Sequence, residues 1–153
     1  MKKLILFLLL GIFLVGCGTS NAESNDGDDT SGSGNEKGIV SGEVVPTLTE
    51  IDNMNYRYQI FNQTEKELTL EFTSGQRFDY AVDTKDGERV YLFSSLASFI
   101  QEVGEEKVKP GEKLSYEINL EEAGLEPGEY VLTVWMTPKD GEKYETSVDV
   151  TIE

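Results

Sequence analysis

The sequence predicts an all-β domain, an antiparallel immunoglobulin-like β-sandwich with one or two short helical turns. Two observations lead to this prediction. Several short stretches alternate apolar and polar residues, which is the period of a strand with one face buried and the other in water. Turn residues separate these stretches at short intervals, and no long helical pattern interrupts them. Together they predict seven to nine strands within residues 43–153.

Six stretches show the alternation, and each is expected to turn one set of side chains toward the core. The stretch 129–136 differs from the others because Val131 and Trp135 make its second face partly apolar as well. Gly, Pro, Asn and Asp mark the turns between the stretches. The stretches are residues 56–62, 66–73, 77–83, 113–120, 129–136 and 143–153, and the turns lie at 62–66, 74–75, 86–87, 110–111, 127–128 and 140–141.

Residues 72–91 contain two breaks in this rhythm. Ser74 and Gly75 predict a turn or a bulge between two strands. Asp86 and Gly87 predict a tight hairpin, because glycine adopts the positive φ that such a turn requires. The acidic residues of this stretch are interpreted as turn residues and as residues on the solvent face of a strand.

Two segments are expected to form helical turns. Ser94 or Ser95 is expected to cap a turn that runs through Leu96, Phe99 and Ile100. Residues 120–124 are expected to form a second, shorter turn.

Residues 1–16 predict a lipoprotein signal peptide. Two lysines precede an apolar run from Leu4 to Val15. A helix needs roughly 20 apolar residues to span a membrane, so this run is too short to span one and is typical of a secretory signal. The ending Leu14, Val15, Gly16, Cys17 resembles the bacterial lipobox, in which the cysteine carries the lipid after cleavage. We therefore expect acyl chains on Cys17 to hold the protein on the extracytoplasmic face of the cell membrane of a Gram-positive bacterium.

Residues 17–42 predict a flexible tether between the lipid and the domain. They are mostly Gly, Ser, Asn, Thr and acidic residues, which offer almost nothing to bury. The acidic run that begins at Asp26 suggests a calcium loop, but Ser31 stands where that loop needs glycine, and no glutamate stands at the twelfth position. No metal or other cofactor is expected.

The domain is strongly acidic. The whole chain has 13 Lys and Arg against 29 Asp and Glu, and residues 43–153 keep 10 against 24, a net charge near −14. A charge of this sign disfavours nucleic acid and anionic lipid as direct partners. A basic protein partner and a simple solubilising surface both remain compatible with it.

The order of motifs resembles the BsuPI-type proteinase inhibitor domain. The resemblance spans nearly the whole domain, with Tyr91 and Phe93 at positions where the family favours Trp. The matching residues are Asn62; Phe72, Ser74, Gly75 and Gln76; Phe78, Asp79 and Tyr80; Asp83, Asp86 and Gly87; Tyr91, Phe93 and Ser94; Phe99 and Gln101; Pro110, Gly111 and Glu112; and Gly128 and Tyr130.

The resemblance implies an immunoglobulin-like sandwich and inhibition of a serine protease. The residues themselves disfavour an enzyme, because the chain has no histidine and its single cysteine is expected to carry lipid. A protein-binding module is therefore the leading hypothesis. The alternative is a structural or complex-assembly lipoprotein of the cell envelope, which would present a broad exposed sheet face instead of a projecting loop.

Two surfaces are candidates for the partner-binding site. One is the segment 94–101, which interrupts the strand rhythm. The other is a set of aromatic residues, Phe61, Tyr91, Phe93 and Trp135, on sheet faces opposite the expected core; the competing interpretation is that some of these pack beneath the segment. The candidate partner-binding residues are Phe93, Ser94, Ser95, Leu96, Phe99, Gln101 and Trp135.

Overall fold

The computed structural model describes residues 42–153, which form nine strands and two short helices. The predicted signal peptide 1–16, Cys17 and the tether as far as residue 41 lie outside the described residues. No helix among the described residues is long and apolar enough to cross a membrane. The strands are β1 (Val44–Asp52), β2 (Asn55–Asn62), β3 (Leu68–Phe72), β4 (Phe78–Thr84), β5 (Arg89–Leu92), β6 (Gly104–Val108), β7 (Lys113–Asn119), β8 (Gly128–Met136) and β9 (Lys143–Ile152); the helices are α1 (Phe93–Leu96) and the 3₁₀ turn η1 (Glu121–Ala123).

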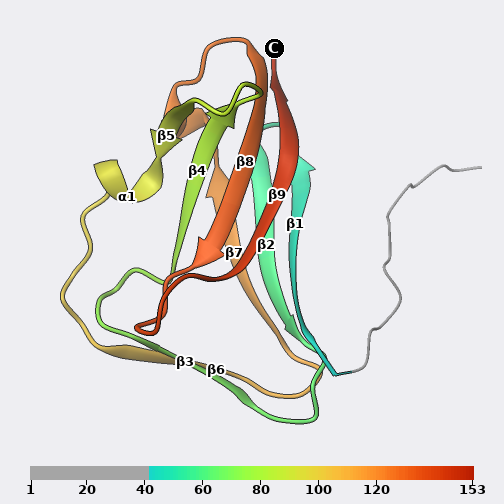
Figure 1. The fold of residues 1–153 in the computed structure, drawn as a ribbon, viewed down its shortest axis with the longest axis vertical. Coiled ribbons are helices and arrows are strands. Elements are labelled where there is room, and N and C mark those ends of the chain that lie inside the picture. The colour runs from blue at the N-terminus through green and yellow to red at the C-terminus, as the bar shows by residue number, and fades with distance from the viewer. Residues whose placement is uncertain (1–41) are drawn as a thin grey trace, which may run out of the picture. The chain divides into compact units, whose positions relative to one another are not determined.

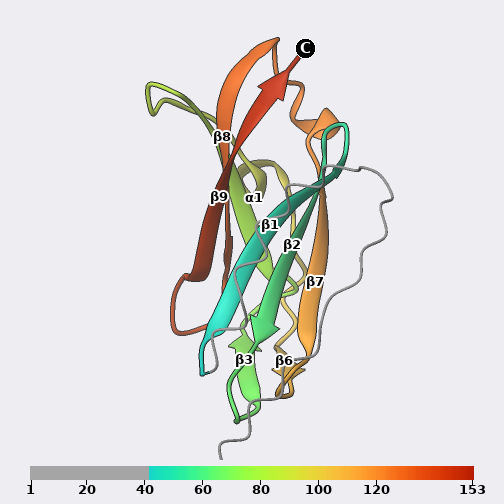
Figure 2. The same ribbon diagram turned by 90° about the vertical axis from the view of Figure 1, so that its right-hand side faces the viewer.

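The strands form three antiparallel sheets. One has the order β1-β2-β7, a second has the order β5-β4-β8-β9, and β3 pairs with β6 alone. The β1-β2-β7 sheet and the four-stranded sheet form the two layers of a sandwich, with β1 beside β9 where the layers meet, and the β3-β6 ribbon extends from one end (Figures 1 and 2). The predicted all-β antiparallel sandwich is confirmed.

The core lies between the inner faces of the two layers. Along β2, Tyr56, Tyr58 and Ile60 are buried, whereas the residues between them are only half-buried. Burying one such side chain contributes about 1.5–3 kcal/mol, and the Tyr58 hydroxyl also donates a hydrogen bond of 2.6 Å to the backbone oxygen of Tyr144. The predicted alternation is confirmed for residues 56–62, 66–73 and 143–153.

The hairpin predicted at residues 86–87 is confirmed. Gly87 has a φ of 87°, and its N–H donates to the oxygen of Thr84 at 2.9 Å, which closes the turn between β4 and β5. The break at 74–75 is different. It connects β3 to β4, which lie in different sheets, so it is a crossing between sheets and neither a hairpin nor a bulge within one sheet.

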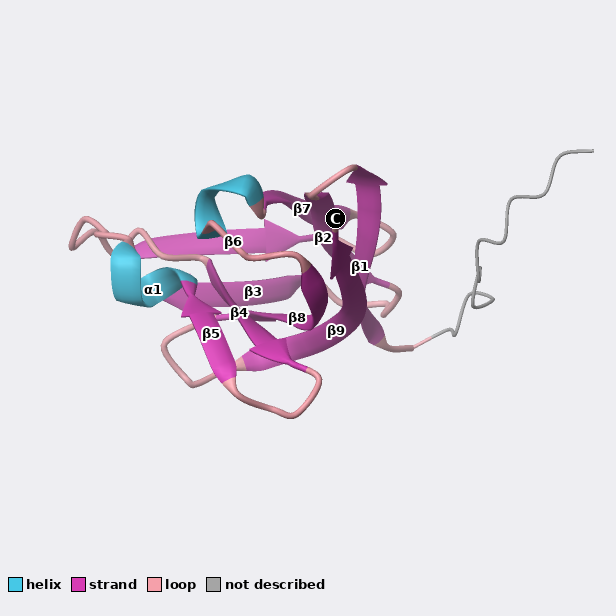
Figure 3. Cartoon of the chain, turned by 90° about the horizontal axis from the view of Figure 1, so that it is seen from above, coloured by secondary structure: helices cyan, strands magenta, loops and turns pink. Residues whose placement is uncertain are grey.

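Of the two predicted helical turns, the one at residues 94–100 differs in the structure, and the one at residues 120–124 is confirmed. Helix α1 begins directly after Leu92, earlier than expected, with no side-chain cap from Ser94 or Ser95, and it ends at Leu96 before reaching Phe99. The physical reason is that an acceptor from another strand takes the place of the cap, as described below. The turn expected at 120–124 is the 3₁₀ helix η1, which Gly124 closes with a φ of 58° (Figure 3).

Asn62 is fully buried, and every polar atom of its side chain is hydrogen bonded. Its amide nitrogen donates to the oxygens of Lys66 and Val108 at 2.8 and 2.7 Å. Its amide oxygen accepts from the nitrogen and the hydroxyl of Thr64 at 3.0 and 2.7 Å. Asn62 therefore ties the 62–66 turn to the end of β6, which confirms that turn.

Two predictions about outward-facing residues are wrong. Asp79 on β4 and Trp135 on β8 are direct partners in the sheet register, and they are only 6% and 7% exposed. Ala81, two residues along β4 on the same side, is buried as well. This part of the outer face is closed to solvent, so Asp79 is not a solvent-face acid and Trp135 is not an exposed interface anchor.

Candidate partner-binding surface

Residues 96–103, hereafter the exposed segment, connect α1 to β6 and carry the most exposed large apolar side chains among the described residues. Leu96, Ile100 and Val103 are 74%, 66% and 82% exposed. Residues 97–103 form neither helix nor strand, and they run along the outside of the molecule from α1 to β6 (Figure 1). Exposed apolar side chains grouped in one stretch are typical of a protein interaction surface.

Asp79 holds the beginning of this region. Its Oδ1 atom accepts hydrogen bonds from the N–H of Ser94 at 3.0 Å and of Tyr80 at 2.9 Å. The residue before α1 is Leu92, whose side chain has no oxygen to cap the helix. The carboxylate of a neighbouring strand therefore satisfies a helix N–H that a serine or aspartate at the N-cap ordinarily satisfies.

An aromatic cluster lies beneath the same region. The ring of Phe93 lies 4.9 Å from that of Tyr80 and 6.0 Å from that of Phe78, and Phe99 meets Phe93 edge-on at 5.7 Å. Burial raises the pKa of Tyr80 above its ordinary value, and the adjacent Tyr91 raises it further. The cluster joins the exposed segment to the core through Phe99 and Phe93.

Gly75 holds the middle of the segment. Its N–H donates to the oxygen of Ile100 at 2.8 Å. A Cβ atom at this position would lie 3.0 Å from Cγ1 of Ile100, which is closer than side chains ordinarily pack. A larger residue at position 75 would therefore press on the Ile100 side chain, which lies against the segment's attachment point.

Arg77 holds the end of the segment, where β6 begins. Its Nε lies 3.1 Å from Oε1 of Glu106, and its Nη1 donates to the oxygen of Ser74 at 2.7 Å. Its guanidinium also lies 4.7 Å from the centre of the Phe72 ring. A Cβ atom on Gly104 would lie 2.1 Å from Nη2 of this arginine, so any other residue there would require the guanidinium to move.

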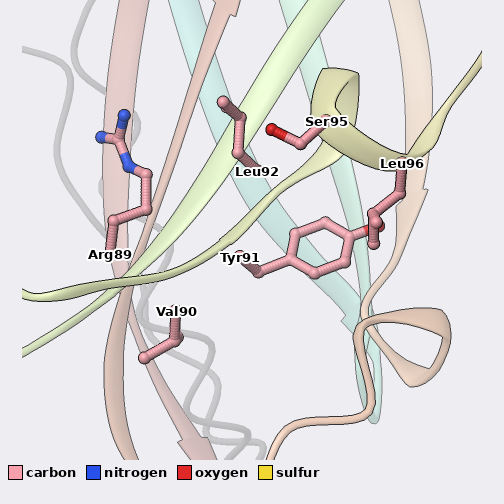
Figure 4. Close-up of a pocket in the computed structure, with 6 residues that line it drawn as sticks. All are labelled: Arg89, Val90, Tyr91, Leu92, Ser95 and Leu96. Carbon is pink, nitrogen blue, oxygen red and sulfur yellow. The ribbon is translucent and has the colours of Figure 1, made fainter.

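A shallow hollow of about 320 Å³ lies beside the start of the exposed segment. Figure 4 shows its lining residues, which come from β5 and α1: Arg89, Val90, Tyr91, Leu92, Ser95 and Leu96. The Arg89 guanidinium is paired with both oxygens of Asp83, at 2.9 and 3.3 Å, which raises its pKa further. The hollow thus offers apolar and hydroxyl groups together with a cation that is already neutralised.

The family model for BsuPI, intracellular proteinase inhibitor, matches residues 45–147. This chain belongs to the BsuPI family. The match covers most of the chain and nearly all of the described residues, and it confirms the resemblance read from the motifs. A comparison with curated proteins gives no match.

The residues proposed for partner binding in this BsuPI domain divide into three groups. Ser95, Leu96 and Gln101 are exposed, and Ser95 and Leu96 also line the hollow. Phe93, Ser94 and Phe99 are half-buried and support the segment from beneath. Trp135 alone is buried away from solvent. The competing interpretation, that some of the aromatic residues pack beneath the segment, is right for Phe93.

The candidate segment 94–101 includes Ile100, but sequence reasoning missed Val103 and the supporting Arg77 and Gly104, and it placed Asp79 on a solvent face. Leu96, Ile100 and Val103 follow the spacing of a helix face, which predicts burial rather than exposure. The supports belong to strands distant in sequence, so no local pattern reveals them. Gly104, which follows the apolar Val103 and has no turn partner in the sequence, was the available signal.

The acidic residues of the BsuPI domain are not gathered into a metal site among residues 42–153. No group of His, Cys, Asp and Glu side chains there is placed to hold a metal ion. The acids instead form isolated ion pairs on the surface, and the lysines and arginines flanking the exposed segment are paired: Arg77 with Glu106, Arg89 with Asp83 and Lys107 with Glu105.

Proposed function

We propose that this protein inhibits a serine protease and that the exposed segment 96–103 is the part that enters the protease cleft. Family membership supports inhibition as the activity. The observation that carries the assignment to this segment is its combination of exposure and support: it has three exposed apolar side chains, and Gly75 holds its backbone at Ile100. Asp79 is bonded to Ser94 just before the segment, and Arg77 lies beside Gly104 just after it.

A held backbone matters because ordering a flexible loop on binding costs free energy. Each side chain immobilised at an interface costs about 0.5–1.5 kcal/mol, and ordering the backbone adds to that cost. A segment whose position is already set by the domain avoids most of this cost. The same support also keeps the segment from adapting to the active site as a good substrate would.

The alternative of a structural or assembly lipoprotein predicts a broad exposed apolar sheet face. The outward residues of β9, however, are polar: Glu145, Ser147, Asp149 and Thr151. The three most exposed large apolar side chains instead lie in the exposed segment, with Val90 on β5 beside its start; Ile51 on β1 stands apart. This distribution favours a projecting binding segment over a sheet face.

We further propose that the inhibitor acts at the outer face of the cell membrane, where lipid on Cys17 anchors it. A tether of about 25 residues has a reach of roughly 25–30 Å, which lets the acidic domain stand clear of anionic lipid. Metabolic labelling with palmitate tests the anchor: label is expected on the wild-type chain and not on Cys17→Ala. Equal labelling of both would overturn it.

Inhibition is tested with the full chain, purified in mild detergent, against subtilisin, elastase, chymotrypsin and trypsin with chromogenic peptide substrates. We expect at least one of these enzymes to be inhibited at micromolar inhibitor. Unchanged hydrolysis by all of them at micromolar excess would overturn the proposal.

A matched pair of variants locates the activity. Replacing Leu96, Ile100 and Val103 together by serine removes the exposed apolar side chains without touching the supports, and inhibition is expected to be lost. Ile51→Ser changes another exposed apolar residue, on β1 and 42% exposed, and should inhibit as the wild type does. Circular dichroism confirms that both variants fold. Full inhibition by the triple variant would show that the segment is not the contact.

A further inference from the structure

We infer that Val103 is the side chain that enters the primary specificity pocket of the protease, and that this pocket is small and apolar. The inference rests on the proposed function. It follows from asking which exposed residue of the segment can offer both its side chain and its backbone carbonyl to an active site, since the protease must direct that carbonyl into its oxyanion hole.

Ile100 does not meet this requirement. Its carbonyl oxygen already accepts the N–H of Gly75 at 2.8 Å and the N–H of Glu102 at 3.0 Å, which uses both lone pairs. Moving the carbonyl into an oxyanion hole would leave Gly75 without a partner. Ile100 therefore serves as an attachment of the segment, with its side chain available only for contacts at the rim.

Leu96 and Phe99 are excluded for other reasons. Leu96 is the last residue of α1 and has a helical backbone, whereas a peptide bound in a protease cleft is extended. Phe99 is half-buried, with its ring against Phe93 at 5.7 Å, so it would have to leave the aromatic cluster to enter a pocket.

Val103 is the remaining exposed apolar residue of the segment. It is 82% exposed, the highest value among the exposed large apolar residues of the described chain. The backbone directly after it is held, because Gly104 begins β6, pairs with Phe72 and lies against Arg77. A branched side chain of three carbons on a supported backbone fits a small apolar pocket, such as that of elastase, better than a deep aromatic slot.

Charge completes the description of the partner. Residues 93–103 contain no lysine or arginine, so the segment has nothing to place against the aspartate at the base of a trypsin-type pocket. Glu102 precedes Val103, and the nearby cations Arg77 and Lys107 are paired with Glu106 and Glu105. The matching protease surface is an apolar pocket with lysine or arginine at its rim, and its association with this chain slows as salt rises.

The experiment compares inhibition constants of the full chain, in mild detergent, for elastase, chymotrypsin and trypsin. We expect elastase to be inhibited most strongly and trypsin least. Val103→Asp is expected to weaken inhibition of elastase by at least about 30-fold, the loss typical of a central interface residue. Val103→Lys is expected to shift inhibition toward trypsin, and Ile51→Asp on β1 serves as the control that should change nothing.

The outcomes separate this inference from the proposed function. If Val103→Asp inhibits as the wild type does while Leu96→Asp does not, the segment remains the contact and the assignment of Val103 is wrong. If trypsin is inhibited more strongly than elastase, the pocket chemistry is wrong while inhibition itself stands. If none of the proteases is inhibited, the proposed function and this inference both fail.

Discussion

Strands β4 and β9 belong to the same sheet, yet they bury their side chains in different ways. Along β9 the residues alternate between the core and water for most of the strand. Along β4, four consecutive residues from Asp79 to Val82 are buried, on both faces of the sheet. The sheet order is β5-β4-β8-β9, so β4 has a neighbour on each side, whereas β9 is the edge strand. Alternation therefore predicts burial along β9 and underestimates it along β4.

Among the substitutions that test this difference between β4 and β9, Trp135→Ala should lower the free energy of unfolding most. Trp135 lies on the outer face beside Asp79 and is 7% exposed, so its loss should lower the free energy of unfolding by about 3–5 kcal/mol. Glu145→Ala, at an outward position of β9, should change it by less than about 0.5 kcal/mol. Urea unfolding followed by circular dichroism measures both. Equal effects would mean that the two outer faces do not differ.

Alkaline pH should lower the stability of the domain through tyrosines that are buried on the core side of the sheets. Burial raises the pKa of Tyr58 and of Tyr80 above the ordinary value of 10.0. Below pH 10 both phenols are protonated in the folded and unfolded states, and their contribution to stability is complete. Above pH 10 the unfolded chain ionises first, so stability falls by about 1.4 kcal/mol per tyrosine per pH unit, or about 3 kcal/mol at pH 11 from Tyr58 and Tyr80 together. Burial raises the pKa of Tyr116 as well, so it adds to this loss.

Urea unfolding at pH 8, 10 and 11 measures this loss. Tyr58→Phe provides the control, because it removes one of the raised phenols and should reduce the fall between pH 10 and pH 11 by about 1 kcal/mol, while Tyr80 and Tyr116 keep their contributions. A free energy of unfolding that stays constant up to pH 11 would contradict the prediction.

Asp79→Ala should produce a smaller loss, about 1–3 kcal/mol, because it leaves the N–H groups of Ser94 and Tyr80 without an acceptor. It should also weaken inhibition, since α1 and the exposed segment lose their first support. Asp79→Asn keeps an oxygen at the same place and should restore most of both properties. Thermal unfolding and inhibition assays measure the two effects, and equal behaviour of the alanine and asparagine variants would argue against the hydrogen bonds.

Asp149→Ala should have the smallest effect. Asp149 is an acid in the same sheet, but it lies on the outward side of β9, and its ion pair with Lys85 is exposed. Such a pair contributes about 0–1 kcal/mol, and less at high salt. Thermal unfolding at low and high salt should show only a slight shift. A loss as large as that of Asp79→Ala would remove the difference between the central and edge strands.

The strands and hairpins of this fold follow from local patterns, and much of the candidate site does not. Alternation locates β2, β3 and β9, and the Asp86–Gly87 pair locates a hairpin. The burial of Asp79 and Trp135 depends on strands on either side, which alternation within one stretch does not describe. The exposure of Ile100 and Val103 depends on Gly75 and Arg77, which hold the chain away from the helix that its spacing suggests.

The buried amide of Asn62 has a practical consequence for producing the protein. Asn62, Gln63 and Thr64 form a glycosylation sequon. In the folded domain the side-chain nitrogen of Asn62 is fully buried and donates to two carbonyl oxygens, so a sugar attached there would displace both. A eukaryotic secretion host can modify the chain before it folds, and the glycosylated fraction would then be unable to close the 62–66 turn. Expression in bacteria avoids this loss.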